Sequence, residues 1–353
     1  MQIIRINTGC QYEVHVGAGL LFGVGEKIRA LLPKAQTAAI VTDETVSKLY
    51  LNTVIDSLTS AEIEHYIYCV PPGEASKSGQ QYLSLLDGFA RDKLTRTDCA
   101  LALGGGVIGD LAGFAAATYL RGLSYVQLPT TLLAMVDSSV GGKTAIDLPS
   151  GKNLAGVFYQ PSLVIADTDC IKTLPEPVFN DGIAEIIKYG MLCSVELLNA
   201  LQHDASGLDL LSVIAQCVCI KRDIVEKDEF DHNLRMLLNF GHTIGHAIEK
   251  SDGYNISHGQ AVAVGMAIDT RAAVRKSLCP PQCQFLLESL LDCYNLPKFT
   301  EFDSETLYKA ALGDKKRAGS DITIVTPRDL GQSELITMPI SSLMSWIETG
   351  LEA

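Results

Sequence analysis

Hydrophobic and polar positions in the first half of the chain form two alternating kinds of segment. Short apolar runs bounded by polar residues predict β-strands. These runs lie at residues 37–43, 62–70, 98–103 and 125–131. The longer segments between them, such as residues 44–59, have apolar positions at the spacing of an α-helix. Strands that alternate with helices predict a parallel sheet, which binds its ligands at the carboxyl ends of its strands.

Beyond residue 174 the strand patterns fade and long helical patterns replace them. Helices are predicted at residues 214–229 and 241–250, and a further helix begins at His258. A chain of 353 residues is also too long for one ordinary hydrophobic core. We therefore expect an α/β nucleotide-binding domain with a parallel sheet at residues 1–168. A mainly α-helical domain that binds metal and substrate is expected at residues 169–353.

The composition predicts a compact globular protein of the cytoplasm. The chain is 47% hydrophobic and 20% charged. Residues 1–14 lack a signal-peptide pattern, and no apolar run is long enough to span a membrane. The ten cysteines are scattered and include no Cys-x-x-Cys pair, which predicts reduced thiols. Cys279 and Cys283 are the one pair whose spacing suits a local cross-link between two cysteines.

The charge balance excludes some partners and constrains others. Lys and Arg total 28 against 41 Asp and Glu, which gives a net charge of −13. Such a protein is a poor candidate for binding nucleic acid or an anionic membrane. An anionic small molecule must therefore be attracted by a local cluster of cations.

A glycine-rich turn follows the third predicted strand. Gly104-Gly-Gly-Val-Ile-Gly-Asp110 fits the Gly-x-Gly-x-x-Gly pattern between a strand and a helix, where backbone amides can hold a pyrophosphate. Glycines also serve tight turns, so the motif alone leaves both interpretations open. Residues 124–131 lack the acidic residue that usually binds the ribose, and Asp43 at an earlier strand end is the candidate for that contact.

A polar, glycine-rich segment follows the fourth predicted strand. It contains Asp137, Lys143, Lys152 and Asn153. Gly-Gly-Lys-Thr at residues 141–144 is not the end of a P-loop, because Asp137 stands where the first glycine of that loop would be. The lysines are either solvated loop residues or part of a site for a small oxyanion.

Histidines and carboxylates in the second half offer metal ligands. If residues 241–250 are helical, His242, His246 and Glu249 share one face, and His258 follows nearby in sequence. This face can hold a divalent metal, or it can simply belong to an amphipathic helix with partly buried histidines. Glu185 and Lys188 lie three residues apart on another predicted helix. They form either an ion pair on its surface or a pair of catalytic groups.

Seven motifs together resemble the 3-dehydroquinate synthase family of the sugar phosphate cyclase superfamily. In chain order they are Gly104-Gly-Gly-Val-Ile-Gly-Asp110, Pro129-Thr-Thr-Leu-Leu, Val136-Asp-Ser-Ser-Val-Gly-Gly-Lys143, Gly151-Lys-Asn153, Ala184-Glu-Ile-Ile-Lys-Tyr-Gly190, Asn239-Phe-Gly-His-Thr-Ile-Gly-His-Ala-Ile-Glu249 and His258-Gly. Any one of them is only suggestive, whereas all seven in order are highly specific. The resemblance extends from about residue 43 to residue 316 and implies a nucleotide-binding α/β domain followed by a metal-binding helical domain.

The resemblance implies an enzyme of the shikimate pathway that converts 3-deoxy-D-arabino-heptulosonate 7-phosphate to 3-dehydroquinate and phosphate. Family members oxidise a substrate hydroxyl with NAD, eliminate phosphate, return the hydride, open the ring and close the carbocycle by an intramolecular aldol reaction. There is no net redox change. The substrate is a small sugar-acid phosphate bound between an NAD-binding domain and a zinc-binding domain, and cobalt is a possible substitute for zinc.

The resemblance also assigns site residues. The metal ligands become Glu185, His242 and His258, in place of the helix face that periodicity alone suggests. NAD is assigned to Asp43, Glu74, Lys77, Gly105, Gly106, Asp110, Thr130, Thr131 and Thr173, with Lys143 and Lys152 beside it. The substrate phosphate is assigned to Lys152, Asn153, Asn239, His246 and Lys315 or Lys316. The carboxylate is assigned to Lys143, Lys221 and Arg235, and the hydroxyls to Asp137 and Lys188.

Arg121 is supplied across a subunit interface in the family, which implies a homodimer. The closest alternative function is a sister cyclase that acts on sedoheptulose 7-phosphate or glucose 6-phosphate, neither of which has a carboxylate. An aminated analogue of the substrate is a further possibility. A metal-dependent alcohol dehydrogenase of the glycerol dehydrogenase type and a non-catalytic binding protein with the same fold are the remaining alternatives.

Overall fold

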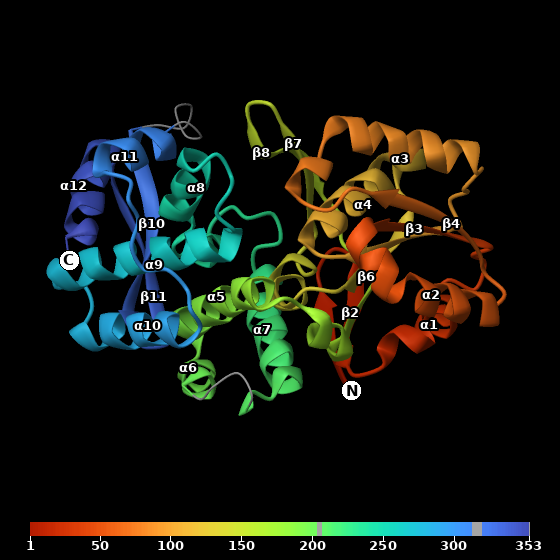
Figure 1. The fold of residues 1–353 in the computed structure, drawn as a ribbon, viewed down its shortest axis with the longest axis horizontal. Coiled ribbons are helices and arrows are strands. Elements are labelled where there is room, and N and C mark those ends of the chain that lie inside the picture. Colours follow the sequence, from red (N-terminus) through yellow and green to blue (C-terminus); the bar gives the residue numbers. More distant parts are fainter. Residues whose placement is uncertain (203–206, 313–319, 353) are drawn as a thin grey trace. The chain divides into compact units, whose positions relative to one another are not determined.

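The computed structural model describes residues 1–202, 207–312 and 320–352 (Figure 1). The chain forms two compact units. The first comprises Met1–Pro175 and Leu210–Glu226, and the second comprises Glu176–Asp209 and Lys227–Ala353. The helix α7 (Leu210–Val225) thus belongs to the first unit, although it lies in the second half of the sequence.

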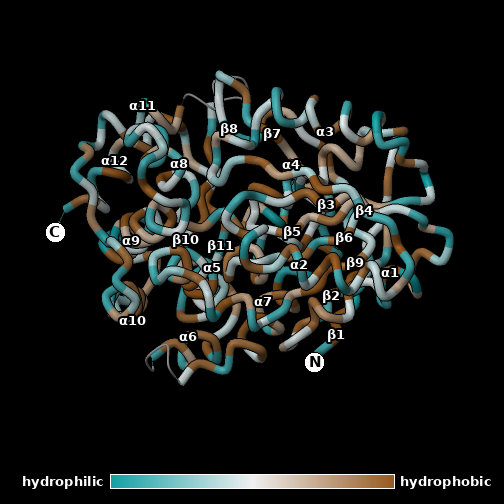
Figure 2. The backbone as a smooth tube through the Cα atoms, turned by 45° about the vertical axis from the view of Figure 1, so that its right-hand side comes forward, coloured by the Kyte–Doolittle hydropathy of each residue, from teal (hydrophilic) through white to brown (hydrophobic). Residues whose placement is uncertain are grey.

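A seven-stranded sheet is the centre of the first unit. Its strands, in spatial order, are β1 (Gln2–Asn7), β2 (Gln11–Gly17), β9 (Leu163–Asp167), β6 (Ser124–Pro129), β5 (Cys99–Gly104), β3 (Thr37–Asp43) and β4 (Glu64–Val70). Only β1 runs antiparallel to its neighbour, and the other six strands are parallel. Every residue of β5 is buried, and runs of hydrophobic residues follow the strands of this sheet in Figure 2. A strand buried on both faces is typical of a parallel sheet covered by helices.

Helices connect these strands and complete the core. The α-helices of the first unit are α1 (Val24–Leu31), α2 (Glu44–Ser60), α3 (Gly79–Arg91), α4 (Gly106–Thr118) and α7. Short helical turns are η1 (Leu20–Gly23), η2 (Glu74–Ser76), η3 (Tyr119–Arg121), η4 (Ala134–Ser138) and η5 (Thr168–Thr173). One core cluster joins α3 and α4 to the sheet through Phe89, Ile108, Leu111 and their neighbours. The predicted parallel α/β fold of this part of the chain is confirmed.

Two features of the first unit differ from the predicted elements. The glycine-rich segment after β6 forms a hairpin of β7 (Lys143–Leu148) and β8 (Gly151–Phe158) instead of an irregular loop. Its buried residues, Thr144, Ala145 and Ile146, are too few to give a clear alternating pattern in the sequence. The helix α4 also begins at Gly106, inside the glycine motif, because only one residue separates it from β5.

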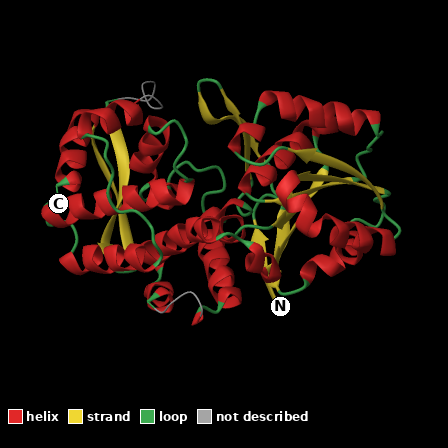
Figure 3. Cartoon of the chain, in the orientation of Figure 1, coloured by secondary structure: helices red, strands yellow, loops and turns green. Residues whose placement is uncertain are grey.

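The second unit is mainly helical, as predicted, with one small sheet (Figure 3). Its helices are α5 (Glu176–Cys193), α6 (Val195–Leu201), η7 (Leu234–Asn239), α8 (His242–Ser251), α9 (His258–Arg275), α10 (Pro281–Cys293), α11 (Ser304–Leu312) and α12 (Ile340–Leu351). The antiparallel strands β10 (Asp321–Asp329) and β11 (Gln332–Pro339) form the sheet. Among the described residues, no helix is both long and apolar enough to span a membrane.

The central helix of this unit is α9, which is buried along most of its length. A Cβ atom on Gly265 would lie only 2.0 Å from the backbone oxygen of Gly241 and 2.9 Å from the backbone nitrogen of Gly245, so α9 contacts the backbone at the start of α8 where only glycine fits. Gly241 itself has a left-handed backbone with φ of 75°. This crossing fixes where α8 begins.

Asp269 on α9 is a buried carboxyl that ties three elements together. Its Oδ1 accepts a hydrogen bond of 2.9 Å from the indole nitrogen of Trp346 on α12, and it also accepts one from the backbone N–H of Gly241. Burial raises the pKa of Asp269 to about 7, although both hydrogen bonds oppose the shift. The folded protein therefore holds a proton on Asp269 more tightly than an unfolded chain does.

We expect this carboxyl to make stability depend on pH. Its pKa in an unfolded chain is about 3.9. The stabilisation from the protonated form is complete below that value and is lost as the pH rises through about 7. Thermal unfolding from pH 5 to pH 8 should show a smaller fall in midpoint for Asp269→Asn than for the parent protein, because the amide stays uncharged. An equal fall in the unfolding midpoint of the two proteins between pH 5 and pH 8 would contradict this role of Asp269.

Candidate metal centre and nucleotide site

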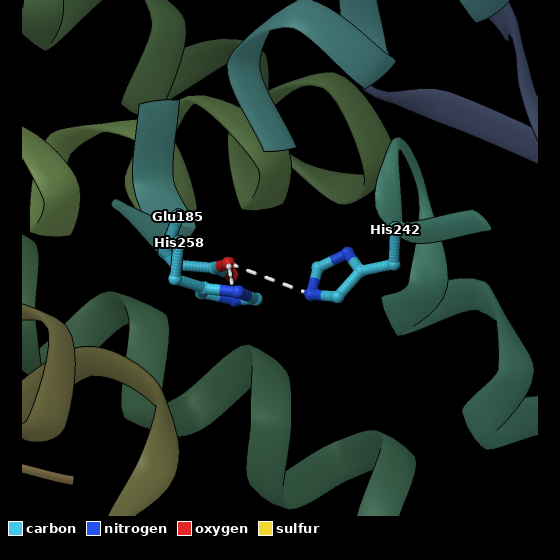
Figure 4. A group of neighbouring side chains, drawn as sticks. All are labelled: Glu185, His242 and His258. Atoms are coloured by element: carbon cyan, nitrogen blue, oxygen red, sulfur yellow. Dashed lines mark ion pairs between the residues drawn. The ribbon is translucent and has the colours of Figure 1, made fainter. Parts of the chain in front are cut away.

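Three side chains from three helices of the second unit converge on one point (Figure 4). Glu185 lies in the middle of α5, and His242 and His258 are the first residues of α8 and α9. The Nε2 atoms of His242 and His258 lie 3.6 Å and 3.5 Å from Oε1 of Glu185. One ligand atom from each residue lies within 4.8 Å of the others, so the three can hold a metal ion.

The local sequence explains why these positions are fixed. Glu185 is fully buried on a helix whose neighbouring residues are apolar. The left-handed Gly241 is the N-cap of α8, so that this helix begins directly at His242. Asp181 on α5 accepts a hydrogen bond of 2.5 Å from Ser257 Oγ, and further ones from the backbone N–H groups of the second and third residues of α9. The carboxylate of Asp181 thus caps α9 where His258 begins the helix.

His242 is neutral and has a defined tautomer. Its Nδ1 lies 3.0 Å from the carbonyl oxygen of Phe240, which can only accept a hydrogen bond, so Nδ1 carries the proton. Burial, and next the positive charge of Lys188, lower the pKa of His242 to about 3. The lone pair of Nε2 therefore faces Glu185 and is available to a metal.

The pKa of His258 is shifted in the opposite direction. Burial acts to lower its pKa, but the carboxylates of Glu185 and Glu249 outweigh burial and raise the pKa to about 10. Its Nδ1 lies 3.6 Å from Oε1 of Glu249. The ring is thus placed between two acidic groups.

Lys188 completes the cluster from one turn further along α5. Its ammonium group forms an ion pair with Oε2 of Glu185, and the Lys188 side chain is only 1% exposed. The pair is therefore buried, unlike the solvated pair that its spacing in the sequence also allowed. A buried ion pair of this kind is typical of a functional site as well as of a core.

The donor set fits a catalytic zinc. Ligand atoms around a tetrahedral zinc lie roughly 3.3–3.5 Å apart, close to the two nitrogen-to-oxygen distances at Glu185. Two imidazoles and one carboxylate also leave a fourth position for substrate or water. His242 has the backbone partner on its other nitrogen that zinc-bound histidines usually have.

The helix face that periodicity suggests lies beside this centre. His246 is 52% exposed, and its Nε2 lies 4.0 Å from Oε2 of Glu249. His246, Glu249 and His258 also form a group that could hold a metal, so His258 is common to both groups. His242, by contrast, belongs to the Glu185 group among the described residues.

The other predicted site residues of the second unit precede α8. Arg235 is 2% exposed, and its Nη1 donates a hydrogen bond of 2.7 Å to the carbonyl oxygen of Glu229. Asp228 shapes this loop by accepting hydrogen bonds from three backbone N–H groups, including that of Arg235. Asn239 is the last residue of η7 and is partly exposed. Lys315 and Lys316 lie outside the described residues.

In the first unit, the predicted nucleotide residues meet at the carboxyl edge of the sheet. The backbone N–H of Thr130 donates to the carbonyl oxygen of Gly104 at 3.0 Å. A Cβ atom on Gly105 would lie 3.1 Å from Thr131 Cγ2, and one on Gly106 would lie 3.1 Å from Ser138 Oγ. These glycines form a close turn at the start of α4, where no side chain of the described residues caps the helix. Backbone amides of such a helix start can bind a phosphate group.

A buried lysine lies beside this turn. Lys77 Nζ is 2.8 Å from Asp110 Oδ2 and 3.4 Å from Glu74 Oε1. Burial acts to lower the pKa of Lys77, but the two carboxylates outweigh it and raise the pKa. Asp43 uses Oδ1 to cap α2, and Thr173 forms a short hydrogen bond with Tyr50.

The remaining predicted residues of the first unit lie in three places. Lys221 on α7 is buried, and its Nζ donates to the backbone oxygen and to Oδ1 of Asp137 at 2.7 Å and 2.5 Å. Asp137 lies in the π-helical turn η4, a form common at functional sites. Lys143, Lys152 and Asn153 lie on the β7–β8 hairpin. Arg121 is exposed and has φ of 68° as the last residue of η3.

Three acidic residues that sequence patterns did not single out position the predicted ones. Asp147 accepts a hydrogen bond of 2.8 Å from the backbone N–H of Asn153, which has a left-handed φ of 57°. Asp181 and Asp269 hold the starts of α9 and α8. Their contacts join residues far apart in the chain or depend on a single turn, so no periodic pattern reveals them.

Comparisons with known proteins agree with this architecture. Residues 67–181 match the model of the 3-dehydroquinate synthase N-terminal family, and residues 182–317 match that of the 3-dehydroquinate synthase C-terminal family. The chain is 42% identical to 3-dehydroquinate synthase from Enterococcus faecalis over 342 residues, which cover 95% of each chain.

Two solved structures share the fold. One is a 2-deoxy-scyllo-inosose synthase complexed with carbaglucose-6-phosphate, NAD+ and Co2+, with a TM-score of 0.88, 23% identity and coverage of 98% of this chain and 99% of that one. The other is 2-epi-5-epi-valiolone synthase from Streptomyces hygroscopicus subsp. jinggangensis with NAD+ and Zn2+ bound, with a TM-score of 0.86, 24% identity and coverage of 99% and 98%.

The fold and the site define the class of the protein. A parallel α/β unit with a glycine-rich crossover, and a helical unit with two histidines and a carboxylate, together form the dehydroquinate synthase-like fold. Within that class, the chain belongs to the 3-dehydroquinate synthase family, because the two family models cover residues 67–317 without interruption.

Removal of one histidine tests the metal centre directly. His242→Ala leaves only Glu185 and His258, and two ligands rarely hold zinc against dialysis. Elemental analysis after dialysis should find about one zinc per chain in the parent protein and almost none in the variant. His232→Ala is the matched control, since His232 is exposed and lies outside both groups. Stoichiometric zinc in His242→Ala would refute the ligand assignment.

Proposed function

We propose that the chain is a 3-dehydroquinate synthase that converts 3-deoxy-D-arabino-heptulosonate 7-phosphate to 3-dehydroquinate and phosphate. The observation that carries the proposal is the Glu185, His242 and His258 cluster in a chain of this family. A relative at 42% identity over 95% of both chains has that name. The reaction is a phosphate elimination and cyclisation with catalytic use of NAD.

The metal centre would take zinc or cobalt, held by Glu185, His242 and His258. The bound ion would supply Lewis acidity toward the hydroxyl and carbonyl oxygens of the substrate. Lys188 neutralises Glu185, and neutral imidazole ligands add no charge, so the four side chains would carry little net charge around a bound ion. The positive charge of a bound ion would therefore remain largely available to the oxygen atoms of the substrate.

The glycine-rich turn of the first unit would hold NAD. Gly105 and Gly106 leave no side chain between the start of α4 and a pyrophosphate. Lys77 is held in place by Asp110 and Glu74, and it offers a fixed donor for a ribose or phosphate oxygen. We assign Asp43, Thr130, Thr131 and Thr173 to the same cofactor, since Asp43 is the last residue of β3 and the two threonines at 130 and 131 directly follow β6.

Fixed cations suit a doubly anionic substrate. Lys221 is held by Asp137, and Arg235 is held by the carbonyl oxygen of Glu229. We assign Lys143, Lys221 and Arg235 to the substrate carboxylate, and Asp137 and Lys188 to its hydroxyls. The phosphate is assigned to Lys152, Asn153, Asn239, His246 and either Lys315 or Lys316. Local cations of this kind offset the net charge of −13.

We also propose a cytoplasmic homodimer. All ten cysteines are free thiols, which suits a reducing compartment. Arg121 is exposed next to Leu120, and both residues have positive φ. A strained, exposed arginine is suited to contact a group on another subunit. Monomers in solution that keep full activity after Arg121→Ala would contradict this assignment.

A turnover assay distinguishes the proposed function from its alternatives. With 3-deoxy-D-arabino-heptulosonate 7-phosphate and a substoichiometric amount of NAD, we expect many turnovers of phosphate release without accumulation of NADH. A chelator should abolish the release, and zinc should restore it. Phosphate release only from a sugar phosphate without a carboxylate would indicate a sister cyclase. NADH that accumulates with a simple polyol would indicate a dehydrogenase.

The carboxylate assignment yields a second prediction. Arg235→Lys keeps the positive charge but loses the planar fork that binds a carboxylate through two hydrogen bonds. Loss of one hydrogen bond to a charged group lowers kcat/KM by roughly 10- to 150-fold. Arg222→Lys is the control, because Arg222 pairs with its neighbour Asp223 at 2.7 Å. Activity that falls only in proportion to thermal stability would show that Arg235 has a structural role.

A further inference from the structure

The ring of His258 faces a different carboxylate with each nitrogen. Nε2 lies 3.5 Å from Oε1 of Glu185, and Nδ1 lies 3.6 Å from Oε1 of Glu249. A metal held with Glu185 uses Nε2, so Nδ1 must then donate its hydrogen to another group. Glu249 on α8 offers the carboxylate oxygen that can accept it.

Packing alone does not fix the orientation of this ring. His258 is the first residue of α9, and Asp181 fixes the backbone there through Ser257 and the next two N–H groups. The His258 side chain itself is 33% exposed. Rotation about its side-chain bonds would carry Nε2 away from Glu185, and a polar contact between Nδ1 and Glu249 opposes that rotation.

Glu249 is well placed for that task. Its side chain is only 3% exposed, on the buried face of α8. Its second oxygen lies 4.0 Å from Nε2 of His246, so the same carboxylate also faces the exposed imidazole. A carboxylate that orients a metal-bound histidine raises the basicity of the ring and fixes its tautomer.

We propose that Glu249 is a positioning residue that holds Nδ1 of His258 and thereby directs Nε2 to the metal. The inference rests on the proposed metal site at Glu185, His242 and His258. Glu249 does not contact the metal in this arrangement. It acts through His258 and also steadies His246.

The same residues allow one competing arrangement. His246, Glu249 and His258 form a group that could bind a metal of its own, with Nδ1 as the ligand. The 4.0 Å separation of His246 from Glu249 exceeds the roughly 3.3–3.5 Å expected between ligands of one tetrahedral zinc. His246 is also half exposed, whereas Glu185 is fully buried. These observations favour a metal at Glu185 and an orienting role for Glu249.

Zinc affinity measured by competition with a chromophoric chelator tests the proposal without an activity assay. Glu249→Ala should weaken zinc binding by about 10- to 100-fold, as loss of such outer partners does. Glu249→Gln keeps an oxygen that can accept from Nδ1 and should recover most of the affinity. Ile248→Ala is the control for lost stability, because Ile248 is a buried neighbour on α8 that lies outside both metal groups. It should lower the thermal midpoint and leave zinc affinity within about twofold of the parent value.

The possible outcomes separate this inference from the metal site itself. A parent protein that binds no zinc would overturn both. Normal zinc affinity in Glu249→Ala, or an equal loss in Ile248→Ala, would overturn only the role of Glu249. A parent that binds two zinc ions per chain, of which Glu249→Ala loses one, would show that Glu249 is itself a ligand. Equal losses in Glu249→Ala and Glu249→Gln would also exclude orientation through a hydrogen bond.

Discussion

A fully buried carboxylate is the constraint on which the second unit depends. Glu185 has no exposed surface, and an ionised carboxylate away from water costs several kcal/mol unless cations or donors surround it. Lys188 on the same helix supplies a positive charge at Oε2, and His258 brings a ring nitrogen to Oε1. Nε2 of His242 also faces Oε1, but it carries a lone pair and donates no hydrogen. The buried carboxylate of Glu185 therefore costs folding free energy, and it also favours the binding of a cation at this site.

The helices that carry these ligands are held at their first residues, where small displacements matter most. Gly241 and Gly265 let α8 and α9 touch backbone to backbone, and a side chain at Gly265 would force them apart. Asp269 and Asp181 then fix the starts of the two helices through backbone N–H groups. A metal-binding side chain on the first residue of a helix is held in a fixed position when the start of that helix is capped, whereas a side chain in a loop is positioned less precisely. Glycine contacts and buried carboxyls therefore set the metal geometry before any metal binds.

Sequence patterns predicted what depends on local periodicity and missed what depends on long-range contacts. The strand at residues 37–43 and the helix after it are fully apparent from apolar spacing, and both exist as predicted. The edge strand β1 is mostly exposed and has no continuous apolar run, β7 has only three consecutive buried residues, and β8 has none. Helical spacing put His242 and His246 together, but Glu185 lies far away in the chain, and its role as a metal ligand came only from the family resemblance. No periodic pattern can show that Asp147 holds Asn153 in a left-handed conformation.

The buried cations of the protein show how an acidic chain can bind an anion. Lys77, Lys188 and Lys221 are each nearly buried, and each is paired with a carboxylate of its own unit. An unpaired buried ammonium would lose its proton, so the carboxylate keeps the lysine charged and also fixes its position. An anionic ligand then competes with the carboxylate that already pairs with the lysine, so the net electrostatic attraction is reduced. Its binding is favoured mainly because the lysine donors are already ordered and lose little conformational entropy on binding. Binding strength in such a site depends on geometry more than on total charge, which is compatible with a net charge of −13.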